Sequence, residues 1–133
     1  MKRRTRRGGF TLVEVLLVLA ILVILGAMVG VGVVQVQKTA NKRAAKTQIG
    51  MLDEAVNLYH VDCGVFPETL DDLRQPGNLR NPDKWAGPYV KKDLPLDPWQ
   101  NDYQYQAEGE DFRIWSFGPD GADGGNDDLD NKS

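Results

Sequence analysis

The dominant pattern along the chain is a continuous apolar run, Phe10–Val34, which follows a short basic segment. Among its 25 residues, only a threonine and Glu14 carry polar side chains. A helix of that length reaches ~37 Å at ~1.5 Å of rise per residue, which exceeds the ~30 Å hydrocarbon core of a bilayer. The pattern therefore predicts a membrane-spanning helix over residues 10–35 and leaves residues 36–133 for a soluble domain.

Helical periodicity continues past the apolar run, from Val36 to Tyr59, with a narrower apolar face. Apolar residues recur there at spacings of four, three, four and three, which is one stripe along a helix. The residues of the stripe are Ala45, Ile49, Leu52, Val56 and Tyr59. Because the stripe begins late, we expect the helix to pack on its own domain only through its second half. Gly64, with Pro67 just beyond it, predicts the end of this helix.

Shorter elements are expected after the helix. Thr69–Arg74 has the pattern of a short helix, and the residues that follow it are rich in loop formers. Two alternating segments, Tyr103–Gln106 and Phe112–Ser116, are typical of strands, and Glu108–Asp111 joins them as a hairpin. One long helix packed through its second half on a small antiparallel sheet is an α+β fold, which is the fold class that the sequence predicts.

Charge is distributed unevenly. Five of the 16 lysine and arginine residues fall within residues 1–9, which contain no acid. The other 11 basic residues face 19 acidic ones, so the rest of the chain is acidic. The basic end should stay cytoplasmic by the positive-inside tendency, with the acidic domain across the membrane. A body poor in basic residues also argues against nucleic acid as a partner.

The N-terminal segment differs from an ordinary secretory signal peptide. Its apolar run is longer than the ~7–15 residues of a signal peptide, and no small-residue cleavage site follows it cleanly. Two small residues, Gly8 and Gly9, stand before the run instead. A cut between Gly9 and Phe10 would remove the basic leader, residues 1–9, and leave the apolar segment as the new N-terminus.

Glu14 needs an explanation, because an ionised carboxylate at membrane depth is costly unless it is paired. After a cut at Gly9, the new α-ammonium of Phe10 would lie four residues before Glu14, on the same helix face. In an assembly, the ammonium of one subunit could instead pair with Glu14 of its neighbour, which would fix the register between subunits. A third interpretation is a glutamate that reaches the membrane surface near the helix end.

The run GGFTLVEVLLVLAILVIL, Gly8–Leu25, resembles the N-terminal signature of type IV pilins and pseudopilins. The signature is specific, because leader charge, glycine, phenylalanine, glutamate position and apolar length must all agree. The resemblance implies that a membrane-embedded prepilin peptidase cuts between Gly9 and Phe10 and methylates the new amine of Phe10. It also implies that Glu14 is the acid used in filament assembly.

Three further segments resemble the family of major pseudopilins of type II secretion systems. They are VDCGVFP (Val61–Pro67), GPYVKKDLPLDPWQNDYQY (Gly87–Tyr105) and WSFGPDGADGGNDDLDN (Trp115–Asn131). The chain departs from the family pattern in two places. Gly30-Val31-Gly32 stands where the family usually has a proline in the apolar helix, and Glu68–Trp85 replaces a family segment.

The resemblance implies a structural protein rather than an enzyme. Such a subunit crosses the bacterial inner membrane once, with its leader cytoplasmic and its domain periplasmic. It forms a helical homopolymer, the periplasmic pseudopilus, whose growth drives folded proteins across the outer membrane. The implied partners are further copies of the chain, minor pseudopilins, the inner-membrane assembly platform, the prepilin peptidase and membrane lipid. The alternative within the same wider family is a type IV pilus subunit for adhesion, motility or DNA uptake.

The segment GPDGADGGNDDLDN, Gly118–Asn131, has too few apolar residues to build a core. It is either an acidic tail without fixed structure or a loop that binds a hard cation such as Ca²⁺, which takes ~6–8 oxygen ligands. It does not match an EF-hand, because Ala122 stands two residues after Asp120 and no glutamate closes the loop.

The resemblance to the major pseudopilins implies one Ca²⁺ bound by a loop over residues 117–130. The implied ligands are the carboxylates of Asp120, Asp127 and Asp128 and the backbone oxygens of Phe117, Ala122 and Gly125.

Cys63 is the only cysteine, so the chain cannot form an internal disulfide. His60 lies three residues earlier, which leaves a membrane-anchored thiol enzyme as an interpretation from a different functional class. A partly buried small residue at the helix end is the simpler role for Cys63, because no third group in a recognised motif orients the pair.

Overall fold

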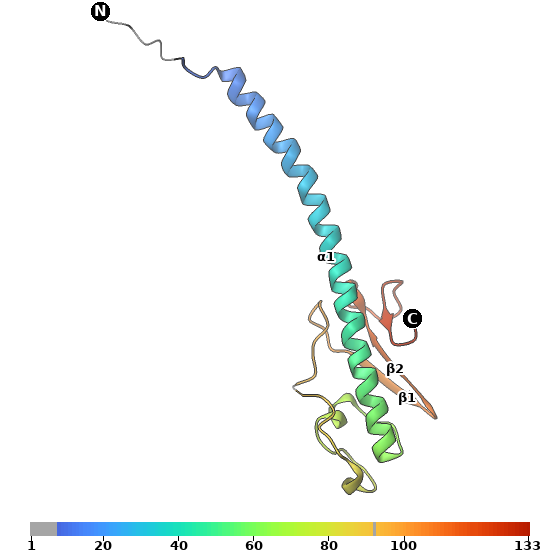
Figure 1. Cartoon of the computed structure of the whole chain (residues 1–133). Helices are drawn as coiled ribbons and strands as arrows, with labels where there is room; N and C mark the ends of the chain where they lie inside the picture. Colours follow the sequence, from blue (N-terminus) through green and yellow to red (C-terminus); the bar gives the residue numbers. More distant parts are fainter. Residues whose placement is uncertain (1–7, 92) are drawn as a thin grey trace, which may run out of the picture. The chain divides into compact units, whose positions relative to one another are not determined.

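The computed structural model describes residues 8–91 and 93–133, and Figure 1 gives the course of the chain. Most of the predicted basic leader, including its five charges, lies in residues 1–7 and therefore outside the described residues. The chain divides into two compact units, Met1–Lys38 and Thr39–Ser133. A 52-residue helix, α1 (Leu12–Cys63), contributes to both units.

In the first unit, the large apolar side chains of α1 that the structure describes are exposed. Their exposed fractions range from 46% at Val15 to 76% at Leu12, and Phe10, just before the helix, is 89% exposed. By length and composition, α1 can cross a membrane. The helix continues without a break through Gly26 and Gly30, although each glycine costs ~1 kcal/mol of helix propensity relative to alanine.

In the second unit, the predicted apolar stripe of α1 is confirmed as the helical side of the core. Each of its residues is at most 2% exposed. They are Ala45, Ile49, Leu52, Val56 and Tyr59. Cys63 extends the stripe by one further turn and is buried as well. The spacing of three and four residues aligns these side chains on one face, which explains why a single helix can cover the sheet.

The end of α1 is where the sequence predicts it. Gly64 has a φ of +76°, in the left-handed region that a residue with a side chain rarely adopts. Its N–H donates to the carbonyl of His60 at 2.8 Å and closes the last turn.

A 3-10 helix, η1 (Leu70–Leu73), confirms the predicted short helix after α1. One carboxylate organises its start, because Asp72 Oδ2 accepts the N–H groups of Glu68 at 2.9 Å and Thr69 at 3.0 Å. Leu73 is fully buried at its end. The helix is thus fixed by a local cap on one side and by core packing on the other.

The segment predicted as loop after η1 contains one further 3-10 turn, η2 (Pro82–Lys84). Trp85 follows it and donates its indole N–H to the carbonyl of Asp72 at 2.9 Å. Tyr89 donates its backbone N–H to the carbonyl of Leu73 at 2.8 Å. These two hydrogen bonds connect the segment to η1. They hold the segment in place although it has little regular secondary structure.

The sheet has three antiparallel strands in the order β1 (Gln104–Glu108), β2 (Asp111–Ser116) and β3 (Leu129–Asp130). The predicted hairpin between the first two strands is confirmed, with Glu108 paired to Asp111 across a two-residue turn. Gly109 begins this turn with a φ of +62°, a conformation that the short hairpin turn requires and that glycine adopts readily.

The predicted alternation along β2 is also confirmed. Phe112, Ile114 and Ser116 are buried, whereas Arg113 is exposed. β1 begins one residue later than predicted and extends two residues further, to Glu108. β3 was not predicted: two residues are too few to show an alternating pattern, and they lie within the expected calcium loop.

The core lies between the second half of α1, the inner face of β2 and the segment that connects them. Figure 1 shows the hairpin of β1 and β2 alongside this part of the helix. The buried apolar residues contributed from outside α1 are Leu70, Leu73, Tyr103, Phe112, Ile114 and Leu129. One long helix on a small antiparallel sheet confirms the predicted α+β fold class.

The ionisation of the four tyrosines should make the stability of this domain fall at alkaline pH. Burial raises the pKa of Tyr59 and that of Tyr89 to about 12. Burial also raises the pKa of Tyr103 and of Tyr105 above the ordinary value. Because the folded pKa values exceed the unfolded one, this stabilising contribution is fully present below pH ~10 and is lost as the pH rises through the folded values.

We therefore expect tyrosinate absorbance to rise together with loss of helical circular dichroism during an alkaline titration of the full chain in detergent. The transition should lie above pH ~10, the value for an unburied tyrosine. Ionisation of one or more tyrosines near the ordinary value, with the circular dichroism unchanged, would contradict this prediction.

Candidate functional site

The predicted assembly residue, Glu14, lies in the first turn of α1 and closes a capping box with Thr11. Glu14 Oε2 accepts the backbone N–H of Thr11 at 3.0 Å. In return, Thr11 Oγ1 accepts the backbone N–H of Glu14 at 3.2 Å. Two N–H groups that a helix start otherwise leaves unpaired are satisfied in this way.

This local role of Glu14 was not among the sequence predictions. Its signal was present, because the Thr-x-x-Glu spacing of Thr11 and Glu14 directly before an apolar run is the signature of a capping box. An acid in the first turn also interacts favourably with the helix dipole. The pairing of Glu14 with a new amine at Phe10 stays a prediction.

The predicted calcium residues lie in the loop that joins β2 to β3. The loop begins with a 3-10 turn, η3 (Gly118–Asp120), and its two arms approach each other closely. A Cβ on Gly118 would lie 2.5 Å from the carbonyl oxygen of Asp127. A side chain at Gly118 would therefore separate the arms, so a glycine is required there for the loop to close.

Two of the three predicted carboxylates face the same space beside Gly125. A Cβ placed on Gly125 would lie 2.4 Å from Asp127 Oδ1 and 3.0 Å from Asp120 Oδ2. The other oxygen of Asp120, Oδ1, accepts the backbone N–H of Ala122 at 3.0 Å. The hydrogen bond fixes the orientation of Asp120 and leaves Oδ2 directed toward the space that it shares with Asp127.

The third carboxylate, Asp128, is held differently. Its Oδ2 accepts the backbone N–H of Gly124 at 2.9 Å. Its Oδ1 is buried and has no hydrogen-bond partner within the part of the chain that the structure describes. A buried carboxylate oxygen without a donor is costly, and a cation is one partner that would satisfy it.

The three acids are not gathered around one point. In residues 8–91 and 93–133, no group of three or more histidine, cysteine, aspartate or glutamate side chains is close enough to hold a metal ion. Carboxylates within a few ångströms of one another repel, which favours the separated arrangement. The donor set nevertheless suits Ca²⁺, since two acids converge beside Gly125 and a third carries an oxygen without a donor.

The three predicted backbone ligands belong to the same loop. Phe117 directly precedes η3, and Ala122 lies just after it. The carbonyl of Gly125 accepts the N–H of Asp128 at 3.5 Å, a long contact that holds it weakly. Along the chain, each of these three residues lies within three positions of a predicted carboxylate residue.

The far end of the loop is tied to α1 by Asn131. Asn131 Oδ1 accepts the backbone N–H of Ile114 at 3.0 Å, and its Nδ2 donates to Asp53 Oδ1 at 2.7 Å. The backbone N–H of Asn131 also donates to the carbonyl of Ile114 at 3.1 Å. This connection was not predicted, because it joins residues that are 78 positions apart in the sequence.

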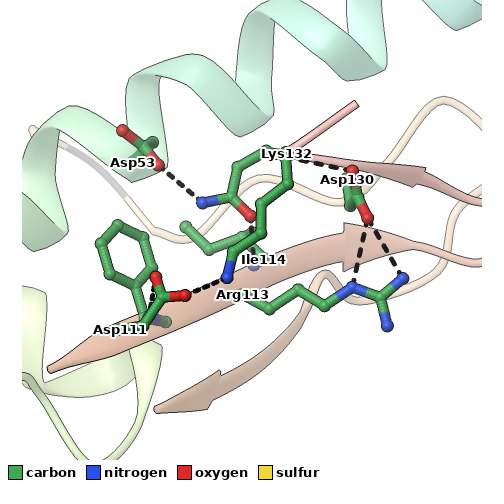
Figure 2. A network of polar contacts seen from close by, with 8 residues as sticks. Asp53, Asp111, Arg113, Ile114, Asp130 and Lys132 are labelled. Atoms are coloured by element: carbon green, nitrogen blue, oxygen red, sulfur yellow. Dashed lines mark hydrogen bonds and ion pairs between the residues drawn. The ribbon is translucent and has the colours of Figure 1, made fainter. Parts of the chain in front are cut away.

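Ion pairs surround this connection, as Figure 2 shows. Asp130 Oδ2 lies 3.2 Å from Arg113 Nη2, across the β2–β3 pair. Lys132 Nζ forms an ion pair with Asp111 at the start of β2. The hydrogen bond from Lys132 lowers the pKa of Asp111 below its ordinary value. The C-terminal residues Asp130 and Lys132 are therefore tied to the first half of β2.

Both residues of the alternative thiol site make packing contacts. Cys63 is buried in the core. The ring of His60 is stacked on Phe66, with 4.1 Å between ring centroids and 13° between planes. Packing accounts for both side chains.

Two family comparisons cover nearly the whole chain. Residues 32–132 match the model described as type II secretion system (T2SS), protein G. Residues 4–30 match the prokaryotic N-terminal methylation motif. The chain belongs to the T2SS protein G family. In this T2SS family member, the methylation motif covers Gly9 and Phe10, where the sequence predicts cleavage and methylation.

Relatives named type II secretion system core protein G occur in Vibrio cholerae and Pseudomonas aeruginosa. Each is 36% identical over 131 residues and covers 94% of this chain, and the matches cover 89% and 92% of those proteins. The solved major pseudopilin from the type 2 secretion system of enterohaemorrhagic Escherichia coli is 29% identical, with a TM-score of 0.60. That match covers 71% of this chain and 85% of the other, which confirms the predicted resemblance to the T2SS major pseudopilins.

We expect replacement of Asn131 by alanine to destabilise the T2SS family fold by about 1–3 kcal/mol, because it removes two side-chain hydrogen bonds and leaves the N–H of Ile114 unpaired. Thermal unfolding of the full chain in detergent measures the change.

Asn126→Ala is the matched control, since Asn126 is exposed in the same loop; it should change stability by less than about 0.5 kcal/mol. Equal effects of the two substitutions would contradict the role of Asn131.

Proposed function

We propose that this chain is the major structural subunit of a T2SS pseudopilus. The observation that carries the proposal is a methylation motif at the start of a helix whose large apolar side chains are exposed from Leu12 to Val36 in the described residues. Burial of apolar surface is worth about 25 cal/mol per Å², so such a surface favours a bilayer or a bundle of neighbouring helices. It suits a subunit that is stored in the membrane and then packed into a filament.

In the proposed topology, the basic leader is cytoplasmic and the domain after α1 is periplasmic. A prepilin peptidase cuts between Gly9 and Phe10 and methylates the Phe10 amine. The cut removes the positive charges that hold the N-terminus in the cytoplasm. The apolar helix can then leave the bilayer lengthwise without carrying a charged leader through it.

Glu14 supports this proposal through its two oxygens. The hydrogen bonds from Thr11 use only Oε2 of Glu14. A carboxylate has acceptor sites on both oxygens, so the cap leaves Oε1 for an ammonium. Pairing with the Phe10 amine of a neighbouring subunit would offset the cost of the charge among apolar helices and set the register between subunits.

Assembly would use repeated contacts between different surfaces of identical subunits, and such contacts produce an open filament when they do not close. Growth of this filament in the periplasm would drive folded proteins across the outer membrane. The proposed partners are other copies of the chain, minor pseudopilins and the inner-membrane assembly platform. The role is mechanical, and no side chain is assigned to catalysis.

We further propose that the loop over residues 117–130 binds one Ca²⁺. Asp120, Asp127 and Asp128 would supply carboxylates, and Phe117, Ala122 and Gly125 would supply backbone oxygens. The support is the shared space beside Gly125 and the buried oxygen of Asp128. Bound Ca²⁺ supplies positive charge that offsets repulsion among the acids and stabilises the folded loop.

To test filament assembly, paired cysteines are placed near Phe10 and near Gly30 in a Cys63→Ser chain and oxidised in secreting cells. We expect crosslinked ladders of subunits, and mass spectrometry should find a mature N-terminus at a methylated Phe10. Glu14→Ala should leave this cleavage intact but reduce crosslinking at least tenfold, because the buried charge pair is lost.

Glu54→Ala is the control for assembly, since it removes an exposed carboxylate from the same helix and should crosslink normally. A chain that retains Met1 in secreting cells, or a Glu14→Ala chain that forms the same ladder as the parent, would overturn the proposal.

To test the calcium site, thermal unfolding of the full chain in detergent is followed with calcium and with a chelator. Calcium should raise the melting temperature, because it binds the folded loop and not the unfolded chain. Asp127→Ala should abolish this shift.

Asp123→Ala is the control, since Asp123 is an exposed acid of the same loop outside the proposed ligand set. It should keep the calcium shift. The site would be ruled out if calcium did not change the melting temperature of the parent chain, or if it raised that of Asp127→Ala by as much as that of the parent.

A further inference from the structure

A buried carboxylate outside the proposed calcium loop contacts the residue directly before that loop. Asp97 is 1% exposed and lies in the turn before β1. Its Oδ1 accepts the backbone N–H groups of Trp99 at 3.0 Å and Asn101 at 2.8 Å. These bonds hold a turn in which Gln100 has a φ of +71°, an unfavourable conformation for a residue with a side chain.

The second oxygen of Asp97 reaches a different part of the chain. Ser116, the last residue of β2, donates its hydroxyl to Asp97 Oδ2 at 2.6 Å and is fully buried. The same Ser116 Oγ accepts the backbone N–H of Gly118 at 3.1 Å. A hydroxyl has one proton, so donation to Asp97 commits that proton and turns the lone pairs of Ser116 toward Gly118.

Gly118 is the residue at which the two arms of the loop meet. Its φ is +73°, and a Cβ there would lie 2.5 Å from the carbonyl oxygen of Asp127 and 3.1 Å from Asp127 Oδ2. If Gly118 moved toward Asp127, it would collide with that arm of the loop. If it moved away, the arm would lose this contact. The hydrogen bonds that link Gly118 to Ser116 and Ser116 to Asp97 fix the position of Gly118. They therefore also fix the space available to the carboxylate of Asp127.

We propose that Asp97 is a positioning residue for the calcium loop, acting through Ser116 and Gly118. The assignment rests on the proposed calcium site and adds to it a residue that lies outside the loop. Asp97 accepts three hydrogen bonds and is not a ligand itself. Its contribution is to hold the loop, before calcium arrives, in a shape that brings Asp127 close to its final position.

Asp97→Asn separates this role from a general role in folding. An asparagine Oδ1 accepts the N–H groups of Trp99 and Asn101 as before, so the turn is kept. Its amide group can only donate toward Ser116, which reverses the hydrogen bond and removes the acceptor for the serine proton. Asp102→Asn is the matched control, because Asp102 is an exposed acid beside the same turn.

The experiment uses the full chain in detergent micelles. Calorimetric titration with CaCl₂ gives the affinity, and hydrogen–deuterium exchange of peptides from residues 117–128 is recorded without calcium. For Asp97→Asn, we expect an affinity about tenfold lower, the effect of one hydrogen bond to a charged group. Exchange in the calcium-free loop should be faster than in the parent, while Asp102→Asn should match the parent in both measurements.

Unchanged affinity and exchange in Asp97→Asn would overturn the assignment, as would a melting temperature lowered equally with and without calcium at unchanged affinity. If Asp97→Asn does not fold, Ser116→Ala tests the same connection, because it leaves both bonds to Oδ1 in place; the same two results are expected.

A parent chain that binds no calcium would remove the calcium site. In that case, exchange in the calcium-free loop alone decides: faster exchange in Asp97→Asn supports positioning of the loop, and equal exchange overturns it.

Discussion

The exposed apolar surface of α1 is the constraint on which the rest of the molecule depends. From Leu12 to Val36, large apolar side chains are exposed, whereas from Ala45 onward one stripe of the same helix is buried in the core. A surface of the first kind is stable only where other apolar groups cover it. The helix therefore needs two environments, one supplied by its own domain and one supplied by a membrane or by neighbouring subunits.

Glu14 lies in the part of α1 whose apolar side chains are exposed, at the very start of the helix. A carboxylate in the first turn satisfies the backbone of Thr11 and complements the helix dipole. The acid therefore has a role in the isolated chain, besides the role in assembly that we propose for it. One residue can serve both purposes because the cap uses one of its oxygens and leaves the other available for an ammonium.

The acidic loop between β2 and β3 likewise depends on residues outside itself, because its own side chains do not fix its conformation. The loop has few apolar groups, and its carboxylates repel one another. Ser116 and Asp97 fix its beginning, and Asn131 fixes its end to Asp53 on α1. With both ends held, the loop would lose less conformational entropy on binding the Ca²⁺ that we propose for it.

The sequence by itself determined the elements that depend on local patterns: the apolar run, the stripe on α1, the helix end at Gly64 and the hairpin of β1 and β2. Each follows from side-chain periodicity or from the backbone freedom of glycine, which are properties of neighbouring residues. Only the tertiary structure decided the two-residue strand β3, the arrangement of the loop carboxylates and the contacts of Asp97. These depend on residues that are far apart in the sequence, up to 78 positions for Asn131 and Asp53, and no local pattern records which distant partner a polar side chain will meet.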